Sequence, residues 1–395
     1  MKKYTFILLA LLVFSARAEE KSAPKITAGP YIQNCSQTEF TVVWQTDCDA
    51  LSWVEVAPDD GTHFYNCTRS KFCQSIHGRR PVGRWHTVRV TGLEPGAAYR
   101  YRVLHKGVVL NHGNRRIRYS ESKGSDVYRR QPYKVKTLDT TSNSTLFFVG
   151  NDFHDNPEAI QTLFAKDYVN STTCDFVLYN GDMVSSFESE ERLIQSVLAP
   201  SVASFASSVP LFFARGNHET RGAWAMNYSQ YFPTSTSAPY YVFYDGCAAF
   251  IVLDAGEDKP DSDIEYMDTA DYDTYRRTQA QWLKSVVESQ EFIQSKVKCV
   301  FLHIPPKSNG WHGQAEVCRL FAPILNNADI DIMFCAHIHK YSLLEAGDTL
   351  TECNFPIICN PNRCRMEVDI NPQRVAYKIV DKELKEIISN EITLK

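Results

Sequence analysis

Two patterns of apolar and polar residues divide the chain. Over residues 26–138, short runs alternate apolar and polar side chains, and turn residues separate the runs. A period of two predicts strands that bury one face, so we expect an all-β sandwich here. The predicted strands are 40–44, 53–56, 86–90, 99–103 and 133–137. The segment 115–131, rich in Arg, Ser and Tyr, is predicted to be a surface insertion.

The second part of the chain, residues 144–395, follows a polar linker at 140–144 and has a mixed pattern. Short apolar runs alternate with stretches whose apolar residues recur at helical spacing. The predicted helices are 158–169, 188–198, 275–292 and 315–325, and strands return at 240–253 and 366–379. Alternation of this kind predicts an α/β layered domain.

Five apolar strands of this second part end in residues that can bind a metal ion. The strands are 146–149, 176–179, 211–214, 300–302 and 332–335. The residues that follow them are Asp152 and His154, then Asp182, Asn217 and His303, and finally His337 and His339. Because open α/β sheets bind ligands at the carboxyl ends of their strands, we expect these side chains to converge.

These seven side chains offer more N and O donors than one ion accepts, and they suit two ions that share a carboxylate. A mixed N and O set favours Fe, Mn or Zn, whereas Ca and Mg prefer oxygen alone. Gly181 lets the backbone turn sharply before Asp182, so that its carboxylate projects from the strand end. The sequence therefore predicts a centre of two metal ions and leaves their identity open.

The order of these motifs resembles that of the calcineurin-like metallophosphoesterases. It reads Asp-x-His, Gly-Asp, Gly-Asn-His-Glu, His and x-His-x-His along the chain. The first part of the chain adds a second likeness, because residues 92–99 resemble the turn and tyrosine corner of fibronectin type III domains, with Trp44 as the expected core indole. Together the two parts make the chain similar to purple acid phosphatases and their bacterial relatives.

The resemblance implies a four-layer α/β/β/α sandwich over residues 144–395, preceded by a fibronectin type III-like sandwich over 26–138. It also implies a ligand set for each ion, with Asp182 shared between them. One ion takes Asp152, His154, Asp182 and His339, and the other takes Asp182, Asn217, His303 and His337. Purple acid phosphatases have Gly in place of His154 and a metal-binding Tyr in place of Ser185. We therefore expect no charge-transfer colour and a centre closer to the general family.

The function that the resemblance implies is hydrolysis of phosphoesters, with Asp182 and His218 as catalytic residues. A hydroxide that bridges the two ions is the expected nucleophile. His218 lies beside Asn217 and is not expected to bind metal. Its expected role is to protonate the leaving oxygen or to stabilise the transition state. Glu219 and Asp155 are both candidates for the carboxylate that orients it.

Several side chains near these motifs are candidates for binding the substrate. Asn217, Arg221 and His312 are predicted to contact its phosphate. The candidates for stacking on a ring are Trp224, Tyr228 and Trp311.

The sequence favours a small-molecule phosphomonoester as substrate. A phosphodiesterase acting on nucleotide or other diesters stays open, as does a non-catalytic binding or adhesion protein. The 42 Lys and Arg against 46 Asp and Glu give a net charge of −4, which argues against a nucleic-acid surface. The oligomeric state is left open.

Residues 1–18 have the pattern of a signal peptide. Lys2 and Lys3 precede an apolar run at 6–14, and Ala16-Arg17-Ala18 supplies small residues for cleavage. The apolar run is too short to span a membrane, and no later stretch approaches the roughly 18 apolar residues that a span requires. We expect an exported protein that is periplasmic or secreted.

Overall fold

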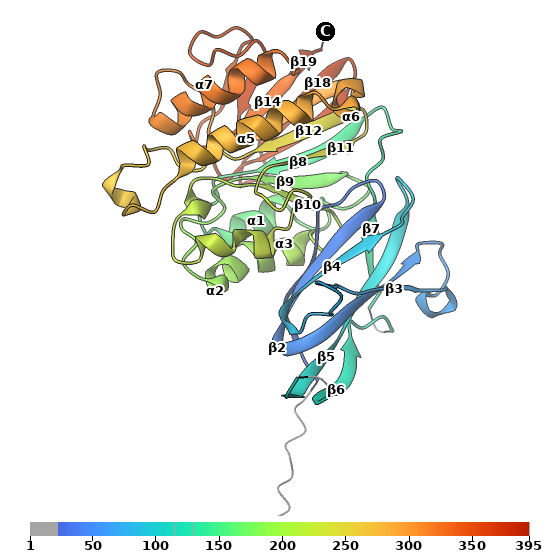
Figure 1. Cartoon of the computed structure of the whole chain (residues 1–395). Helices are drawn as coiled ribbons and strands as arrows, with labels where there is room; N and C mark the ends of the chain where they lie inside the picture. Colours follow the sequence, from blue (N-terminus) through green and yellow to red (C-terminus); the bar gives the residue numbers. More distant parts are fainter. Residues whose placement is uncertain (1–22, 114, 129, 395) are drawn as a thin grey trace, which may run out of the picture.

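The computed structural model describes residues 23–394, apart from 114 and 129 (Figure 1). The expected signal peptide at 1–18 lies outside the described residues. The chain forms a β-rich part followed by a larger α/β part. Within the described residues, no helix has the length and apolar character needed to cross a membrane.

The β-rich part is built around one long strand, β2 (Glu39–Pro58), which replaces the two separate strands predicted at 40–44 and 53–56. Its neighbours are β1 (Ile26–Gln33), β3 (Ser70–Phe72), β4 (Gly83–Thr91), β5 (Ala98–Asn111), β6 (Ile117–Gly124) and β7 (Tyr133–Lys136), and a 3₁₀ turn, η1 (Phe64–Asn66), precedes β3. The first half of β2 pairs mainly with β1 and β4, and its second half pairs with β3 and β5. Side chains from both halves share one core, so this part is consistent with the predicted sandwich.

Two details of this part match the predicted fibronectin type III-like features. The backbone N–H of Glu94 donates to Tyr99 Oη (2.9 Å), which closes the corner before β5. Trp44 is fully buried in the core. The segment 115–131, predicted to be a surface insertion, contains strand β6, which the sequence did not predict and which pairs with β5. None of the side chains of β6 is buried, so no apolar alternation marked it.

The α/β part contains two six-stranded sheets. The first, in the order β10-β9-β8-β17-β18-β19, consists of β8 (Thr145–Gly150), β9 (Phe176–Asn180), β10 (Leu211–Ala214), β17 (Arg365–Asn371), β18 (Arg374–Val380) and β19 (Glu386–Thr393). The second, in the order β11-β12-β13-β14-β16-β15, consists of β11 (Tyr241–Asp245), β12 (Ala248–Leu253), β13 (Val297–Leu302), β14 (Ile332–Cys335), β15 (Ser342–Leu344) and β16 (Ile357–Cys359). Strands β8–β10 are parallel, as are β12–β14, so each group brings its carboxyl ends to one edge.

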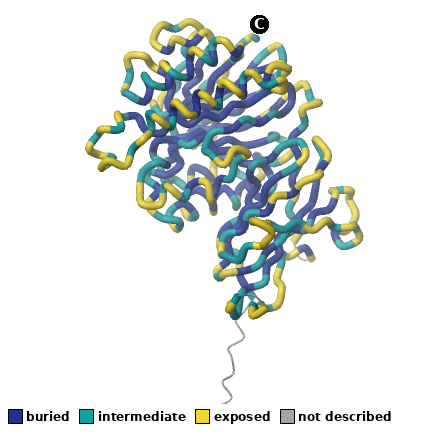
Figure 2. Tube along the Cα trace, viewed as in Figure 1, coloured by how far each residue is buried: buried dark blue, intermediate teal, exposed yellow. Residues whose placement is uncertain are grey.

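Helices cover the outer face of each sheet (Figures 1 and 2). The first sheet is covered by α1 (Pro157–Leu163), α2 (Glu190–Leu193) and α3 (Ala199–Ser204), with a π-helical segment, η2 (Ile194–Leu198), joining the last two. The second is covered by α5 (Tyr272–Val287), α6 (Gln290–Gln294) and α7 (His312–Asn326). The shorter elements are α4 (Tyr228–Tyr231), η3 (His218–Thr220), η4 (Ala225–Asn227) and η5 (Ile264–Tyr266).

The side chains of β8 show how the layers form. Phe147 points between the sheets, where its ring stacks on Phe176 (centroids 4.8 Å apart). It also packs edge-on against Phe250 (5.4 Å) and Phe301 (5.8 Å) of the second sheet. Its neighbour Phe148 belongs to the core beneath the helices, because successive strand residues face opposite sides. The predicted four-layer α/β/β/α arrangement is confirmed.

The β-rich part packs on the helical layer of the first sheet. Tyr31 Oη donates to the carbonyl of Tyr231 (2.8 Å), and Tyr101 Oη donates to the carbonyl of Ser207 (2.7 Å). All of these hydroxyl groups are buried, so each bond satisfies a donor that water does not reach. The contact holds the two parts together.

Candidate metal centre

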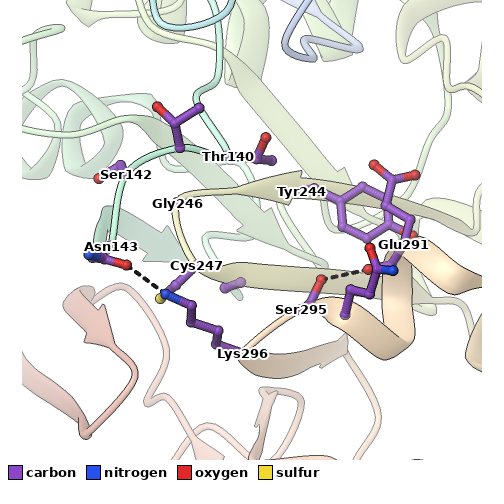
Figure 3. Close-up of a pocket in the computed structure, with 12 residues that line it drawn as sticks. Thr140, Ser142, Asn143, Tyr244, Gly246, Cys247, Glu291, Ser295 and Lys296 are labelled. Atoms are coloured by element: carbon purple, nitrogen blue, oxygen red, sulfur yellow. Dashed lines mark hydrogen bonds between the residues drawn. The ribbon is translucent and has the colours of Figure 1, made fainter.

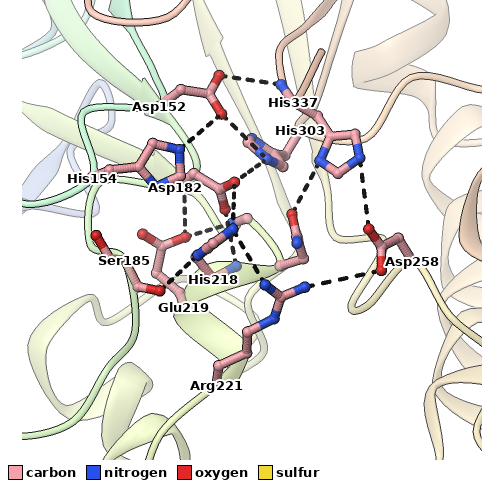
Figure 4. A network of polar contacts seen from close by, with 12 residues as sticks. Asp152, His154, Asp182, Ser185, His218, Glu219, Arg221, Asp258, His303 and His337 are labelled. Atoms are coloured by element: carbon pink, nitrogen blue, oxygen red, sulfur yellow. Dashed lines mark hydrogen bonds and ion pairs between the residues drawn. The ribbon is translucent and has the colours of Figure 1, made fainter. Parts of the chain in front are cut away.

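The five strand ends singled out from the sequence meet at one place (Figure 4). Strands β8, β9 and β10 of the first sheet and β13 and β14 of the second bring their carboxyl ends to this place. Carboxylate and imidazole atoms there fall into three overlapping groups, within each of which all ligand atoms lie within 4.8 Å of one another. The groups are Asp152, His154 and His339; His154, Asp182 and His218; and Asp182, His303 and His337.

The first group forms the more exposed half of the centre. Asp152 Oδ2 accepts hydrogen bonds from the Asn151 side-chain amide (2.7 Å) and from the His337 backbone N–H (3.2 Å). Its other oxygen, Oδ1, lies 3.2 Å from His339 Nε2 and 3.8 Å from His154 Nε2. The two Nε2 atoms are themselves 3.2 Å apart. Three ligand atoms therefore face one point.

The buried half contains Asp182, the carboxylate that is predicted to be shared by two ions. Asp182 Oδ1 accepts the His218 backbone N–H (2.9 Å), and Oδ2 lies 3.0 Å from His303 Nε2. His303 Nδ1 donates to the carbonyl of Asn180 (2.7 Å), which leaves Nε2 able to bind a cation. Asn217 Oδ1 completes this half, 3.2 Å from Nδ1 of His337.

These residues fit two cations that share Asp182. Asp152 Oδ1 and His303 Nε2 are buried and have no hydrogen-bond partner among the described residues. Buried polar atoms are normally satisfied, and an exception calls for an ion or ligand. Carboxylate, amide and imidazole donors together suit Zn, Mn or Fe. The sequence-predicted ligands are thus all brought to the centre.

The charges of the buried half depend on one another. Burial opposes a charged imidazole at His303, but Asp182 and then Asp152 raise its pKa to about 10. Burial, followed by the positive charge of His303, lowers the pKa of His337 to about 4. Although burial opposes ionisation of Asp182, His303 holds the pKa of that carboxyl below its usual range. A cation that binds here takes the place of the His303 proton.

The turns that follow these strands share an unfavourable backbone conformation. Five of the candidate ligands have a left-handed backbone with positive φ, namely Asp152 (53°), His154 (47°), Asp182 (55°), His337 (68°) and His339 (60°). Residues other than glycine adopt this region at a cost, and such strain collects at functional sites. Gly181 and Gly216 leave room in these turns, since a Cβ at either position would overlap His303 or Asp182. The turns therefore aim the ligands inward.

His218 lies at the edge of the centre. Its Nδ1 donates to the carbonyl of Ser185 (2.6 Å), so the ring orientation and the tautomer are both set by the backbone. Nε2 lies 3.3 Å from Arg221 Nη1 and 3.8 Å from Asp182 Oδ2. This nitrogen therefore lies between a guanidinium and a candidate metal ligand.

Neither candidate carboxylate orients His218 directly. Glu219 accepts the backbone N–H groups of Asp182 (2.8 Å), Met183 (2.7 Å) and Gly216 (2.9 Å), and so ties two ligand-bearing turns together. Asp155 accepts the N–H of Ser185 (2.9 Å), whose carbonyl holds His218. Asp155 is therefore linked to His218 through one intervening residue, Ser185.

Two acidic residues that sequence reasoning missed belong to the same network. Glu257 forms a two-bond ion pair with Arg221, from Nε to Oε1 (2.6 Å) and from Nη2 to Oε2 (2.9 Å). Asp258 places Oδ2 3.9 Å from His337 Nε2 (Figure 4). Both follow strand β12, so the strand-end rule would have found them if it had been applied to the predicted strand 240–253.

The other substrate candidates differ in position. His312 pairs with Asp273 through Nε2 and Oδ1 (2.8 Å). Tyr228 is buried, and Trp224 Nε1 donates to Tyr231 Oη (2.7 Å). Trp311 is exposed and lines a cavity beside the centre. The roles of Asn217, Arg221 and His312 in binding phosphate stay predictions.

Comparison with known proteins places this centre in context. A family model described as calcineurin-like phosphoesterase matches residues 146–341. No curated protein matches the sequence. The purple acid phosphatase PPD1 from yellow lupin (Lupinus luteus) seeds is 14% identical, with a TM-score of 0.63 over 94% of this chain and 74% of its own. GAP50, described as the anchor in the inner membrane complex of Plasmodium, is 14% identical, with a TM-score of 0.48 over 64% of this chain and 90% of its own. The lupin structure shows a shared fold.

Proposed function

Because residues 146–341 are a calcineurin-like phosphoesterase domain, we propose that the chain hydrolyses small phosphomonoesters at a pair of metal ions. The observation that carries the proposal is a chain of overlapping ligand groups. His154 belongs to one group with Asp152 and His339 and to another with Asp182, and Asp182 belongs to a third with His303 and His337. A single structural ion needs only about four ligands, so this excess of donors around an open edge favours a catalytic role.

The side chains have separate tasks in this proposal. Divalent cations bound here supply Lewis-acid activation of a water molecule and of the phosphoryl group. We assign His218 Nε2 to deliver a proton to the leaving oxygen, while the Ser185 carbonyl keeps Nδ1 protonated and the ring in place. In the structure Nε2 accepts a hydrogen bond from Arg221 Nη1 (3.3 Å), so the guanidinium has to turn toward the phosphate before Nε2 carries that proton.

Arg221 supplies positive charge beside the same nitrogen. Its guanidinium is fixed by Glu257, and Nη1 is the nitrogen that lies toward His218. We assign it to a non-bridging oxygen of the phosphate, which a guanidinium can hold without a proton transfer. A monoester dianion gains more from this extra charge than a diester monoanion, which favours monoesters.

The test is turnover by purified protein stripped of metal and reloaded with Mn or Zn. We expect a higher kcat/KM with p-nitrophenyl phosphate than with bis(p-nitrophenyl) phosphate, and no turnover in chelator. Preference for the bis ester would indicate the phosphodiesterase alternative. Failure to hydrolyse either compound with both ions bound would leave a binding or adhesion protein.

Export through the signal peptide belongs to the same proposal. Residues 1–18 carry the positive start, apolar run and small-residue cleavage site of a signal peptide. Expression of the full chain in bacteria should release a mature protein that begins at Glu19 and is found in the periplasm or medium. Mass spectrometry of the purified protein measures this, and an intact Met1 in a cytoplasmic fraction would contradict it.

A further inference from the structure

Two cavities of the described structure differ in their relation to the metal centre. One, of about 300 Å³, lies between the linker and α6, where Lys296 Nζ donates to Asn143 Oδ1 (Figure 3). None of its lining residues belongs to the centre. The other, of about 520 Å³, is lined at one end by His337 and Asp258. This second cavity, here called the side cavity, is continuous with the proposed catalytic site.

The walls of the side cavity are largely apolar. Pro306, Trp311, Leu344 and Leu350 line it, together with Ile338. Trp311 is 60% exposed and Leu350 43% exposed, although each belongs to a residue type that is normally shielded. Apolar side chains left exposed around one concavity beside a polar centre are typical of a ligand site. The volume suits a small organic group.

The ring of Trp311 determines which group fits best. Trp311 directly precedes helix α7, so the start of this helix fixes its backbone beside the cavity that its side chain lines. A flat ring gains more from an indole face than a branched or short alkyl group does. Where the cavity meets the centre, Asp258 Oδ2 lies 3.9 Å from His337 Nε2, and Oδ1 lies 3.9 Å from Arg221 Nη2. The polar end of the cavity is therefore joined to residues proposed to hold the metal and the phosphate.

We propose that the side cavity binds the aromatic alcohol portion of a phosphoester whose phosphate lies at the metal centre. The proposal deepens the function proposed above and rests on it. Trp311 stacks on the ring, and His337 and Asp258 mark the junction between cavity and centre. The enzyme therefore selects substrates by the ring that the phosphate carries.

The test compares two phosphates whose leaving groups are both primary alcohols, namely 2-phenylethyl phosphate and ethyl phosphate. Trp311→Ala should raise KM for the phenylethyl ester by about 5- to 10-fold and leave the ethyl ester within about twofold. Trp311→Phe should retain most of the preference, because it keeps a ring. Ile293→Ala, which truncates an exposed apolar residue of α6, should change neither value.

Two results would overturn the proposal. One is an equal change of KM for both esters, which would mean that Trp311 only supports the local fold. The other is an unchanged KM ratio in Trp311→Ala. Binding of 2-phenylethylphosphonate and ethylphosphonate, measured by calorimetry, separates this proposal from the function itself. A phenyl preference that depends on Trp311 in a protein without turnover would sustain the cavity and refute the hydrolase.

Discussion

The two halves of the candidate metal centre both contain carboxylate and imidazole ligands, and they differ in the burial of one imidazole each. In the outer half, the side chain of His339 is 46% exposed, whereas in the inner half His303 is completely buried. The other ligands are similar: Asp152 is completely buried and Asp182 is 2% exposed, and His154 and His337 are 15% and 19% exposed. The inner half also has its imidazole locked by a backbone carbonyl, that of Asn180.

This difference predicts which half binds its ion more tightly and exchanges it more slowly. A ligand held by hydrogen bonds from the fold loses little freedom when it binds a cation, and the cation gains affinity. The buried half should therefore retain its ion, whereas the outer half, open to water, should exchange its ion more readily. Each carboxylate reaches a ligand of the other half, because Asp182 lies in one group with His154 and Asp152 Oδ1 lies 3.9 Å from His303 Nε2. In our proposal Asp182 is the carboxylate that both ions share.

The largest effect should come from the shared carboxylate. Asp182→Asn removes the negative charge between the halves, so we expect kcat/KM to fall by at least about 10⁴-fold and both ions to bind weakly. Metal content by mass spectrometry and turnover measure the change together. Asp369→Asn, on β17 and paired with Arg374 outside the centre, is the matched control. If Asp182→Asn still bound metal ions fully in both halves, Asp182 would not be the carboxylate that the two ions share.

A variant of His218 tests whether this residue acts in catalysis without binding either ion. His218→Ala should keep both ions and lower kcat by about 10²–10⁴-fold, because the proton for the leaving oxygen is lost. The loss should be smallest with p-nitrophenyl phosphate, whose leaving group needs little protonation. Loss of an ion in this variant would instead mean that His218 is a metal ligand. The ligand atoms of His154, Asp182 and His218 lie within 4.8 Å of one another, which is close enough for a shared ion.

Single-ligand variants measure the comparison itself. We expect His303→Ala to weaken metal binding by about 100-fold and His339→Ala by about tenfold, because the exposed ligand is more easily replaced by water. Titration of metal-free protein with Zn or Mn gives both affinities. Equal losses in the two variants would show that burial does not distinguish the halves.

Much of this architecture was predictable because it depends on side chains at regular places. A buried strand is recognised by its apolar run, and a ligand at its end by its residue type, as for Asp182 and His303. The tyrosine corner was predictable for a similar reason, since Tyr99 and the preceding turn lie close in sequence.

Other features were not predictable from the same signals. The group that orients His218 is the backbone carbonyl of Ser185, and every residue has such a carbonyl. Strand β6 has no buried face, so it lacked the alternation that marks a strand. Glu257 and Asp258 are a different case, because the same rule applied to the predicted strand 240–253 would have found them, although only the fold shows that their partners are Arg221 and His337.

The pH dependence of metal binding is the test most selective for the inner half. His303 has a pKa of about 10 and therefore carries a proton below that pH, whereas an imidazole must be neutral to bind a cation. Binding therefore releases this proton, and affinity should rise by about tenfold for each pH unit between pH 6 and 9. His337, with a pKa of about 4, is neutral over that range and adds nothing to the pH dependence.

Calorimetry in buffers of different ionisation enthalpy counts the released proton. The slope should disappear for the inner ion in His303→Ala, and a flat profile in the unaltered protein would show that no proton is displaced there.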